Sequence, residues 1–146
     1  MKYFTQRPLS LTLQKLKLQQ VYPKLIDKIF IYKNSLYCEM RLQPSENSCI
    51  YKVKIKYKLR ERPKVWMIEP QVKKFNGEYP IHKYGFDEAG HIELCVYCPY
   101  LDKWDEVHMF LAEVFVPWVA TWLRTYECWL ATGIWFYDEE HPKKLR

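Results

Sequence analysis

Two cysteines in the second half of the chain, Cys95 and Cys98, lie in the run Cys95-Val96-Tyr97-Cys98-Pro99. A C-x-x-C spacing suits a redox pair or half of a zinc site. A redox pair would open a helix after a strand, whereas Pro99 follows this pair and the surrounding residues indicate a loop. A zinc site needs a second close pair of ligands, and no other cysteines or histidines have that spacing. We therefore expect no metal and no cofactor, and favour the alternative that one of the two cysteines is merely buried.

Histidines near Cys95 suggest a different chemistry, which is acyl transfer. His82 and His91 lie on the same irregular segment as Cys95, and a nucleophilic cysteine with a nearby histidine is the minimum set for this reaction. His108 and His141 stand alone in the sequence, where a histidine is more often structural or exposed than catalytic. The usual Cys–His hydrolase signatures around the thiol are absent.

Acidic residues surround Cys95 in the sequence, namely Asp87, Glu88, Glu93 and Asp102. A negative surround disfavours the thiolate, so we expect the pKa of this thiol to be held up rather than down. The sequence thus predicts a slow and selective nucleophile that reacts with a docked substrate and gains most of its rate from proximity.

Basic residues lie mostly in the first half of the chain. The 146 residues have a net charge of +6. Residues 1–74 contain 17 basic and 5 acidic residues (net +12), and residues 75–146 contain 6 and 12 (net −6). Four of these basic residues are lysines that alternate with apolar residues, namely Lys52, Lys54, Lys56 and Lys58. A row of lysines on one face of a strand can track a phosphate backbone. We favour the alternative that these lysines form a solvated face of the sheet, which discourages aggregation at its edge.

The first half of the chain predicts a helix followed by an antiparallel sheet. Leu9, Leu13 and Leu16 follow the i, i+4, i+7 spacing of an apolar helix face within residues 9–20. Strand-like segments come next, with turn residues between them, and their lengths predict an antiparallel meander. These segments are residues 29–42, 49–59 and 64–69.

The second half predicts an irregular active-site loop and a long helix. Residues 72–103 have no clear periodicity, and a segment of that length is usually functional or contains short elements. From Val107 to Trp129, apolar residues recur at steps of four and three. This spacing predicts a core helix, kinked at Pro117 and ended by Gly133. We expect its aromatic side chains to form packed core rather than a ligand cage.

Length and composition indicate a single α+β domain, residues 1–146, located in the cytoplasm. The four glycines have neither G-x-G nor P-loop spacing, which excludes glycine-rich nucleotide cradles. The N-terminus lacks the apolar run of a signal peptide, and no apolar stretch is long enough to span a bilayer. Five cysteines, an odd number, are typical of reduced thiols.

The order of these elements and the residues around Cys95 resemble the ubiquitin-conjugating enzyme family. The resemblance implies an N-terminal helix, an antiparallel β-meander, an active-site loop and a long C-terminal helix over nearly the whole chain. The C-terminal runs are similar to one bacterial subset, the stand-alone conjugating-enzyme-like proteins of CBASS (cyclic-oligonucleotide-based anti-phage signalling) operons, which have no activating domain. The runs that carry the resemblance are Pro80–Tyr84, Gly90–Tyr97, Trp104, Phe115–Leu123, Tyr126–Trp135 and Glu140–Pro142.

The resemblance implies that Cys95 accepts an acyl group as a thioester, while His82 orients the loop or relays a proton. The implied acyl donor is the C-terminus of the operon's cGAS/DncV-like nucleotidyltransferase. The asparagine by which the family stabilises the oxyanion is missing, because Lys83 follows His82. We expect that role to fall to backbone N–H groups, to Tyr84, to His91 or to the partner. The implied supporting residues are Tyr84, His91, Trp104 and His141.

Two other functions stay open at this point. The chain is also consistent with a non-catalytic adaptor, which binds the nucleotidyltransferase through the face that carries Lys52, Lys54, Lys56 and Lys58. It is further consistent with an RNA-binding domain that uses the same lysines. We do not expect a nucleic acid to be a partner, and the oligomeric state is left open. Binding to phosphates would weaken steeply with salt, so a nucleic-acid titration at two salt concentrations separates these functions.

Overall fold

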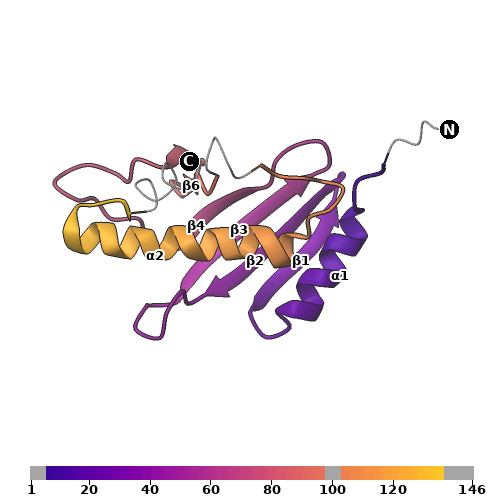
Figure 1. The fold of residues 1–146 in the computed structure, drawn as a ribbon, viewed down its shortest axis with the longest axis horizontal. Coiled ribbons are helices and arrows are strands. Elements are labelled where there is room, and N and C mark those ends of the chain that lie inside the picture. The colour runs from indigo at the N-terminus through magenta and orange to yellow at the C-terminus, as the bar shows by residue number, and fades with distance from the viewer. Residues whose placement is uncertain (1–5, 98–102, 137–146) are drawn as a thin grey trace, which may run out of the picture.

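The protein consists of two layers, a sheet and the helices on one of its faces, in a computed structural model that describes residues 6–97 and 103–136 (Figure 1). The elements are α1 (Leu11–Val21), β1 (Ile26–Tyr32), β2 (Ser35–Leu42), β3 (Tyr51–Lys58), β4 (Lys64–Glu69), β5 (Lys83–Phe86), β6 (Ile92–Leu94), the π-helical turn η1 (Leu111–Phe115) and α2 (Val116–Thr132). The strands form one antiparallel sheet in the order β1-β2-β3-β4-β6-β5. This arrangement confirms the predicted α+β class.

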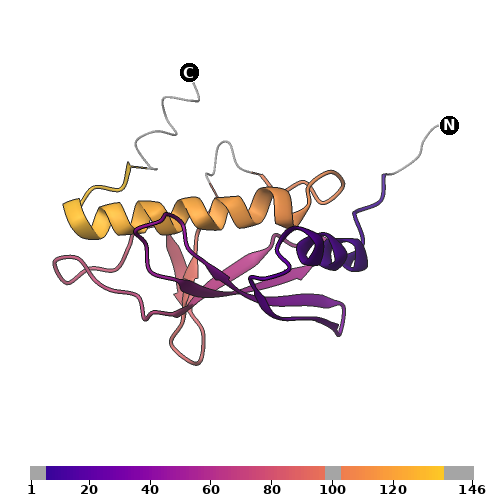
Figure 2. The same ribbon diagram turned by 90° about the horizontal axis from the view of Figure 1, so that it is seen from below.

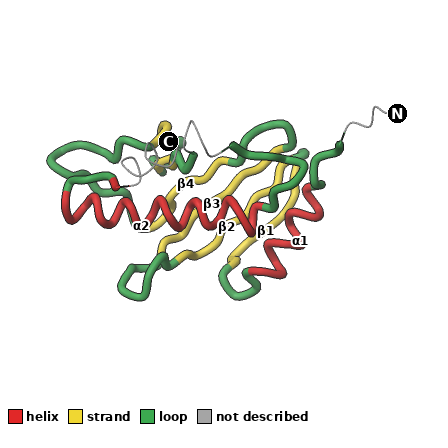
Figure 3. Tube along the Cα trace, in the orientation of Figure 1, coloured by secondary structure: helices red, strands yellow, loops and turns green. Residues whose placement is uncertain are grey.

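The helices leave one face of the sheet open. α2 crosses the sheet, with the strands side by side beneath it (Figure 3). α1 packs against β1, β2 and η1. Seen edge-on, the opposite face of the sheet is covered by none of the helices in the described part of the chain (Figure 2). No helix within residues 6–97 and 103–136 is long and apolar enough to cross a membrane.

The first helix forms where the sequence predicts it, but a different face is buried. Ser10 caps α1 by accepting a hydrogen bond from the Leu13 N–H at 3.1 Å. Two leucines of the apolar face that predicted this helix, Leu13 and Leu16, are 48% and 55% exposed, so that face is not the one that α1 buries. The residues that α1 buries are instead Gln14 and Leu18.

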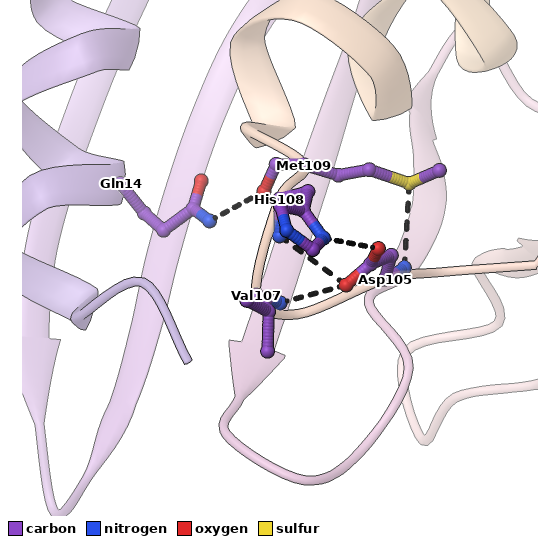
Figure 4. Close-up of polar contacts among 5 residues, drawn as sticks. All are labelled: Gln14, Asp105, Val107, His108 and Met109. Atoms are coloured by element: carbon purple, nitrogen blue, oxygen red, sulfur yellow. Dashed lines mark hydrogen bonds and ion pairs between the residues drawn. The ribbon is translucent and has the colours of Figure 1, made fainter. Parts of the chain in front are cut away.

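Gln14 sets this orientation of α1, because its amide makes two hydrogen bonds inside the fold. Its Nε2 donates to the Met109 carbonyl at 2.9 Å, and its Oε1 accepts from the Leu111 N–H at 2.8 Å. Figure 4 shows Gln14 reaching the loop before η1, where the Asp105 carboxylate holds the turn through Val107 N–H and His108. A buried amide is stable only when it is paired in this way.

The meander contains one more strand than the sequence predicts. The segment 29–42 was expected to be a single strand, but it turns at Lys33 and Asn34, whose φ angles are +48° and +64°. Two successive left-handed residues form the kind of tight turn that joins β1 to β2. The predicted alternation within 49–59 is confirmed by β3, in which the apolar side chains are buried and the lysines face outward. The predicted segment 64–69 coincides with β4.

The irregular segment 72–103 contains the hairpin of β5 and β6, which periodicity did not reveal. Its turn is held by Asp87, which accepts hydrogen bonds from the Ala89 and His91 N–H groups at 2.9 and 2.8 Å. β6 then pairs with β4 on one side and with β5 on the other. As a result, the residues that follow β6 lie next to the residues that precede β5.

The long helix begins later than predicted. Helical structure starts at Leu111 rather than Val107, as the π-helical turn η1, and continues as α2. Pro117 lies in the first turn of α2, directly after η1, and the kink predicted there stays a prediction. Gly133 ends α2 at φ +80°, which confirms the predicted cap.

The core lies between the inner face of the sheet and α2. Its helix side is aromatic, as predicted: Trp122 and Tyr126 are fully buried and stack at 5.3 Å, and Trp135 packs on Trp122 from beyond the helix end at 5.2 Å. Because these rings pack on one another, α2 is a rigid support for the loops that lie along it.

Candidate active site

Cys95 lies directly after β6 and is half-buried. Its backbone N–H donates to the His82 carbonyl at 3.1 Å, which joins the two loops that flank the β5–β6 hairpin. The thiol is 3.4 Å from the Tyr84 hydroxyl and 3.7 Å from the Tyr97 carbonyl. The hairpin therefore gathers residues from both of its ends around one sulfur atom.

His82 is held beside Cys95 by the long helix. The Trp122 Nε1–H donates to the His82 carbonyl at 2.8 Å, and the His82 ring packs against Trp135 with 5.5 Å between ring centroids. The His82 side chain lies close enough to the Cys95 thiol to favour its ionised form, which lowers the pKa of the thiol. The aromatic core of α2 thus positions the histidine, and the histidine in turn reaches the sulfur atom.

The pKa of the Cys95 thiol is lowered, which corrects the expectation drawn from its acidic neighbours. Burial opposes ionisation, but hydrogen bonds from His82 and Tyr84 and the charge of His82 favour the thiolate more strongly. Two of the four carboxylates have partners of their own: Asp87 binds the hairpin turn, and Glu93 lies 3.6 Å from Arg62. Asp102 lies outside the described residues.

Tyr84 remains a hydrogen-bond donor at neutral pH. Burial and the neighbouring thiol raise the pKa of Tyr84 to about 12. Its hydroxyl proton is therefore available to the sulfur atom, at the measured separation of 3.4 Å. A donated hydrogen bond stabilises a thiolate more than a thiol, which is consistent with the lowered pKa of Cys95.

Arg62 belongs to this site, although the sequence analysis did not identify it. Its guanidinium lies over the Tyr84 ring at 4.2 Å and over the Tyr97 ring at 5.6 Å, and Glu93 pairs with it from β6. Cation–π contacts of this kind hold an aromatic side chain in one orientation. Arg62 lies in the loop between β3 and β4, in the run Arg60-Glu61-Arg62, which carries no spacing signal.

The other predicted supporting residues lie in different places. The His91 Nδ1 is 3.1 Å from an Asp87 oxygen, so this histidine braces the hairpin turn. The Trp104 Nε1–H donates to the Tyr57 hydroxyl at 3.1 Å, and the Trp104 ring packs against Phe115. Both residues therefore have contacts that support the fold around the thiol. His141 and Cys98 lie outside the described residues.

The predicted lysine row lies on the open face of the sheet, and part of it is neutralised. Lys52 is 3.6 Å from Glu39, and Lys54 is 3.9 Å from Asp87. Lys54 also lies over the Trp66 ring. The remaining two lysines of the row, Lys56 and Lys58, line a cleft at the other end of β3.

No metal centre is formed by the residues whose placement is described. Within 6–97 and 103–136, no group of three or more histidine, cysteine or acidic side chains is arranged to hold an ion. Cys38 is fully buried, and burial raises the pKa of its thiol to about 12. Cys95 thus differs from Cys38 in both its access to solvent and its ease of ionisation.

Comparison with known proteins identifies the family to which this site belongs. The family model of the type II CBASS E2 protein matches residues 14–142. The chain belongs to the type II CBASS E2 family. Membership gives this E2 protein a role in CBASS, and the E2 designation is that of a conjugating enzyme. No curated protein matches the sequence.

Proposed function

We propose that this CBASS E2 protein accepts the C-terminal acyl group of its cognate cGAS/DncV-like nucleotidyltransferase as a thioester on Cys95, and that it regulates that enzyme in anti-phage defence. The observation that carries the proposal is a half-buried thiol that lies 3.4 Å from the Tyr84 hydroxyl, on a residue whose backbone N–H donates to the His82 carbonyl. Family membership supplies the CBASS setting. The lowered pKa increases the fraction of the nucleophilic thiolate near neutral pH.

The proposed reaction begins with an acyl group that arrives already activated, as a thioester or an acyl adenylate. The Cys95 thiolate attacks the carbonyl carbon, so a carbon–sulfur bond forms while the bond to the activating group breaks and that group leaves with the electron pair. In the second step the acyl group passes from Cys95 to an amine, and Cys95 is now the leaving group. The amine nitrogen bonds to the carbonyl carbon and gives up a proton, and Cys95 leaves again as the thiolate.

Tyr84 is the proposed source of oxyanion stabilisation in place of the missing asparagine. The Cys95 N–H already donates to the His82 carbonyl, and His91 is bound to Asp87. The Tyr84 hydroxyl lies 3.4 Å from the sulfur atom, where it accepts from the thiol and would donate to the thiolate or to the oxyanion that develops beside it. In this scheme His82 takes the proton of the attacking amine during discharge.

Three residues have a proposed supporting role around the thiol: Trp104, His91 and His141. Trp104 and His91 would act by fixing the loops on both sides of the thiol, through Tyr57 and Asp87 respectively. The assignment of His141 stays a prediction, because it rests on the family resemblance alone. The lysine row of β3 is the proposed docking face for the nucleotidyltransferase.

Co-expression with the operon's nucleotidyltransferase tests the proposal. We expect an adduct of the two chains on a non-reducing gel, which reductant cleaves. Cys95→Ala should abolish this adduct, whereas the matched variants Cys98→Ala and Cys128→Ala should retain it. Cys128 is an exposed thiol, so it controls for non-specific disulfide formation. An adduct that survives in Cys95→Ala, or one that depends on Cys98, would contradict the assignment.

A further inference from the structure

Two clefts adjoin the active site and meet at the loop between β3 and β4. The first, here called the active-site cleft, has a volume of about 450 Å³ and is lined by Tyr84, Tyr97, Trp104 and Lys103 among others. The Tyr84 hydroxyl and the Tyr97 carbonyl lie 3.4 and 3.7 Å from the Cys95 sulfur atom, so this cleft is lined by two residues that contact the thiol. The lining of the active-site cleft also includes Arg62.

The second cleft is strongly basic. This lysine cleft has a volume of about 300 Å³, and Glu61 is the acidic residue among its lining residues. It lies where the β1–β2 turn, the end of β3 and the start of β4 come together. The basic residues that line the lysine cleft are Lys33, Lys56, Lys58, Arg62 and Lys64.

Most of the charge in the lysine cleft is not compensated within the described chain. Over residues 6–97 and 103–136, the ion pairs formed by β3 lysines involve Lys52 and Lys54, at the far end of the strand. Lys56 and Lys33 lie instead over the Tyr37 and Tyr32 rings, at 5.6 and 5.4 Å. Clustered cations of one sign at close range repel one another, and an anionic ligand relieves that repulsion.

The two clefts are neighbours on the β3–β4 loop, here called the track. They share Glu61 and Arg62 as lining residues, so a ligand that extends from the lysine cleft past Arg62 would reach the active-site cleft. Arg62 in turn stacks on Tyr84, whose hydroxyl lies at the thiol. An acyl donor whose C-terminus is bound to Cys95 can therefore place the residues before that C-terminus in the lysine cleft.

The lining of the track favours a peptide over a nucleic acid. Nucleic-acid grooves pair cations with free aromatic faces on which bases stack. Here Arg62 covers the Tyr84 and Tyr97 rings, and Lys56 covers Tyr37. Glu61 and Glu106 also line the active-site cleft, where they would repel a continuous phosphate backbone.

We propose that the lysine cleft binds an acidic peptide segment that lies shortly before the C-terminal carbonyl group received by Cys95. This inference rests on the proposed function, because it assigns the cleft to the tail of the acyl donor. Carboxylates of the segment would pair with Lys56, Lys58 and Lys64, while the uncharged end crosses Arg62 to the thiol. The cleft would thereby select donors by the charge of their tails before any bond forms.

A binding assay tests this inference without using the thioester reaction. The probes are the fluorescein-labelled acidic peptide DEEDGSGSA and its amide counterpart NQQNGSGSA, titrated with the full-length Cys95→Ala protein. We expect the acidic peptide to bind more tightly, and its affinity to fall as salt is added. Reversing two cleft charges with Lys58→Glu and Lys64→Glu should weaken binding about tenfold, because two exposed attractive pairs are replaced by repulsive ones.

The matched control makes the same charge change outside the track. Lys24→Glu with Lys73→Glu alters two exposed lysines that line neither cleft, and it should leave the affinity unchanged. Equal binding of the two peptides, or an equal loss in the control variant, would overturn the inference. Tighter binding of oligothymidylate than of the acidic peptide, lost with Lys58→Glu and Lys64→Glu, would assign the cleft to nucleic acid instead. Because no covalent step enters this assay, its failure is distinct from failure of adduct formation at Cys95.

Discussion

Tyr84→Phe removes one hydroxyl from the active site and leaves the rest of the ring in place. The hydroxyl lies 3.4 Å from the Cys95 sulfur atom, whereas the contact with Arg62 is made by the ring face at 4.2 Å. The variant should therefore fold normally and lose one donated hydrogen bond. Because that bond favours the thiolate, its loss should raise the pKa of the Cys95 thiol.

The size of the expected pKa change follows from the strength of the hydrogen bond between the Tyr84 hydroxyl and the Cys95 thiolate. A hydrogen bond to a charged group contributes about 1.5–3 kcal/mol. The sulfur acceptor and the 37% exposure of Tyr84 reduce this to about 1 kcal/mol. At a pH below the thiol pKa, about 1 kcal/mol corresponds to about fivefold less thiolate. A more basic thiolate is intrinsically more nucleophilic by about twofold, so the net loss of rate is about two- to threefold.

Alkylation by iodoacetamide across a pH series measures both the pKa of the Cys95 thiol and the rate at which it reacts. We expect the inflection of the wild-type rate to lie below the ordinary cysteine value, and that of Tyr84→Phe to lie above the wild-type inflection. The plateau rate at high pH should not fall. Tyr97→Phe is the matched control, because its hydroxyl donates to the Pro63 carbonyl at 2.7 Å rather than to the thiol. An unchanged or lowered inflection in Tyr84→Phe would refute the role given to this hydroxyl.

Two further predictions concern thiol selectivity and the anchor of α1. Brief alkylation at neutral pH, followed by peptide mapping, should modify Cys95 but spare Cys38, whose thiol is buried and has a pKa raised to about 12; labelling of Cys38 in the folded protein would contradict that burial. Gln14→Ala should lower the free energy of unfolding by about 2–4 kcal/mol in urea denaturation, because it leaves the Met109 carbonyl and the Leu111 N–H buried without a partner. Gln20→Ala, at an exposed position of the same helix, should cost less than about 0.5 kcal/mol, and equal losses in the two variants would show that the amide contacts do not anchor α1.

Much of the fold could be predicted because its elements have clear periods. β3 alternates strictly between buried and outward residues, and Gly133 ends α2 as its position predicts. The β1–β2 turn was missed because it consists of Lys33 and Asn34 without a glycine. The face that α1 buries could not be predicted because a buried Gln14, which pairs with backbone groups from a distant segment, has no apolar signature.

The site was only partly predictable, for a related reason. Cys95, His82 and Tyr84 lie on one segment and were chosen together, and the β5–β6 hairpin brings them into contact. The sign of the thiol pKa depends on where the carboxylates point, which a sequence does not show. Arg62 reaches the site from the β3–β4 loop, which is distant in sequence but lies near β6 because β4 pairs with β6.

Intact mass analysis of the protein co-expressed with its operon's nucleotidyltransferase tests whether Cys95 forms a thioester with the donor's C-terminus. We expect a species whose mass is the sum of the two chains less one water. Dithiothreitol should split it into the free E2 protein and the donor, which carries the dithiothreitol as a new thioester until that bond hydrolyses. Fragmentation should place the bond between Cys95 and the C-terminal residue of the donor. A bond at any other residue, or two unmodified chains when an activated donor is present, would contradict the account.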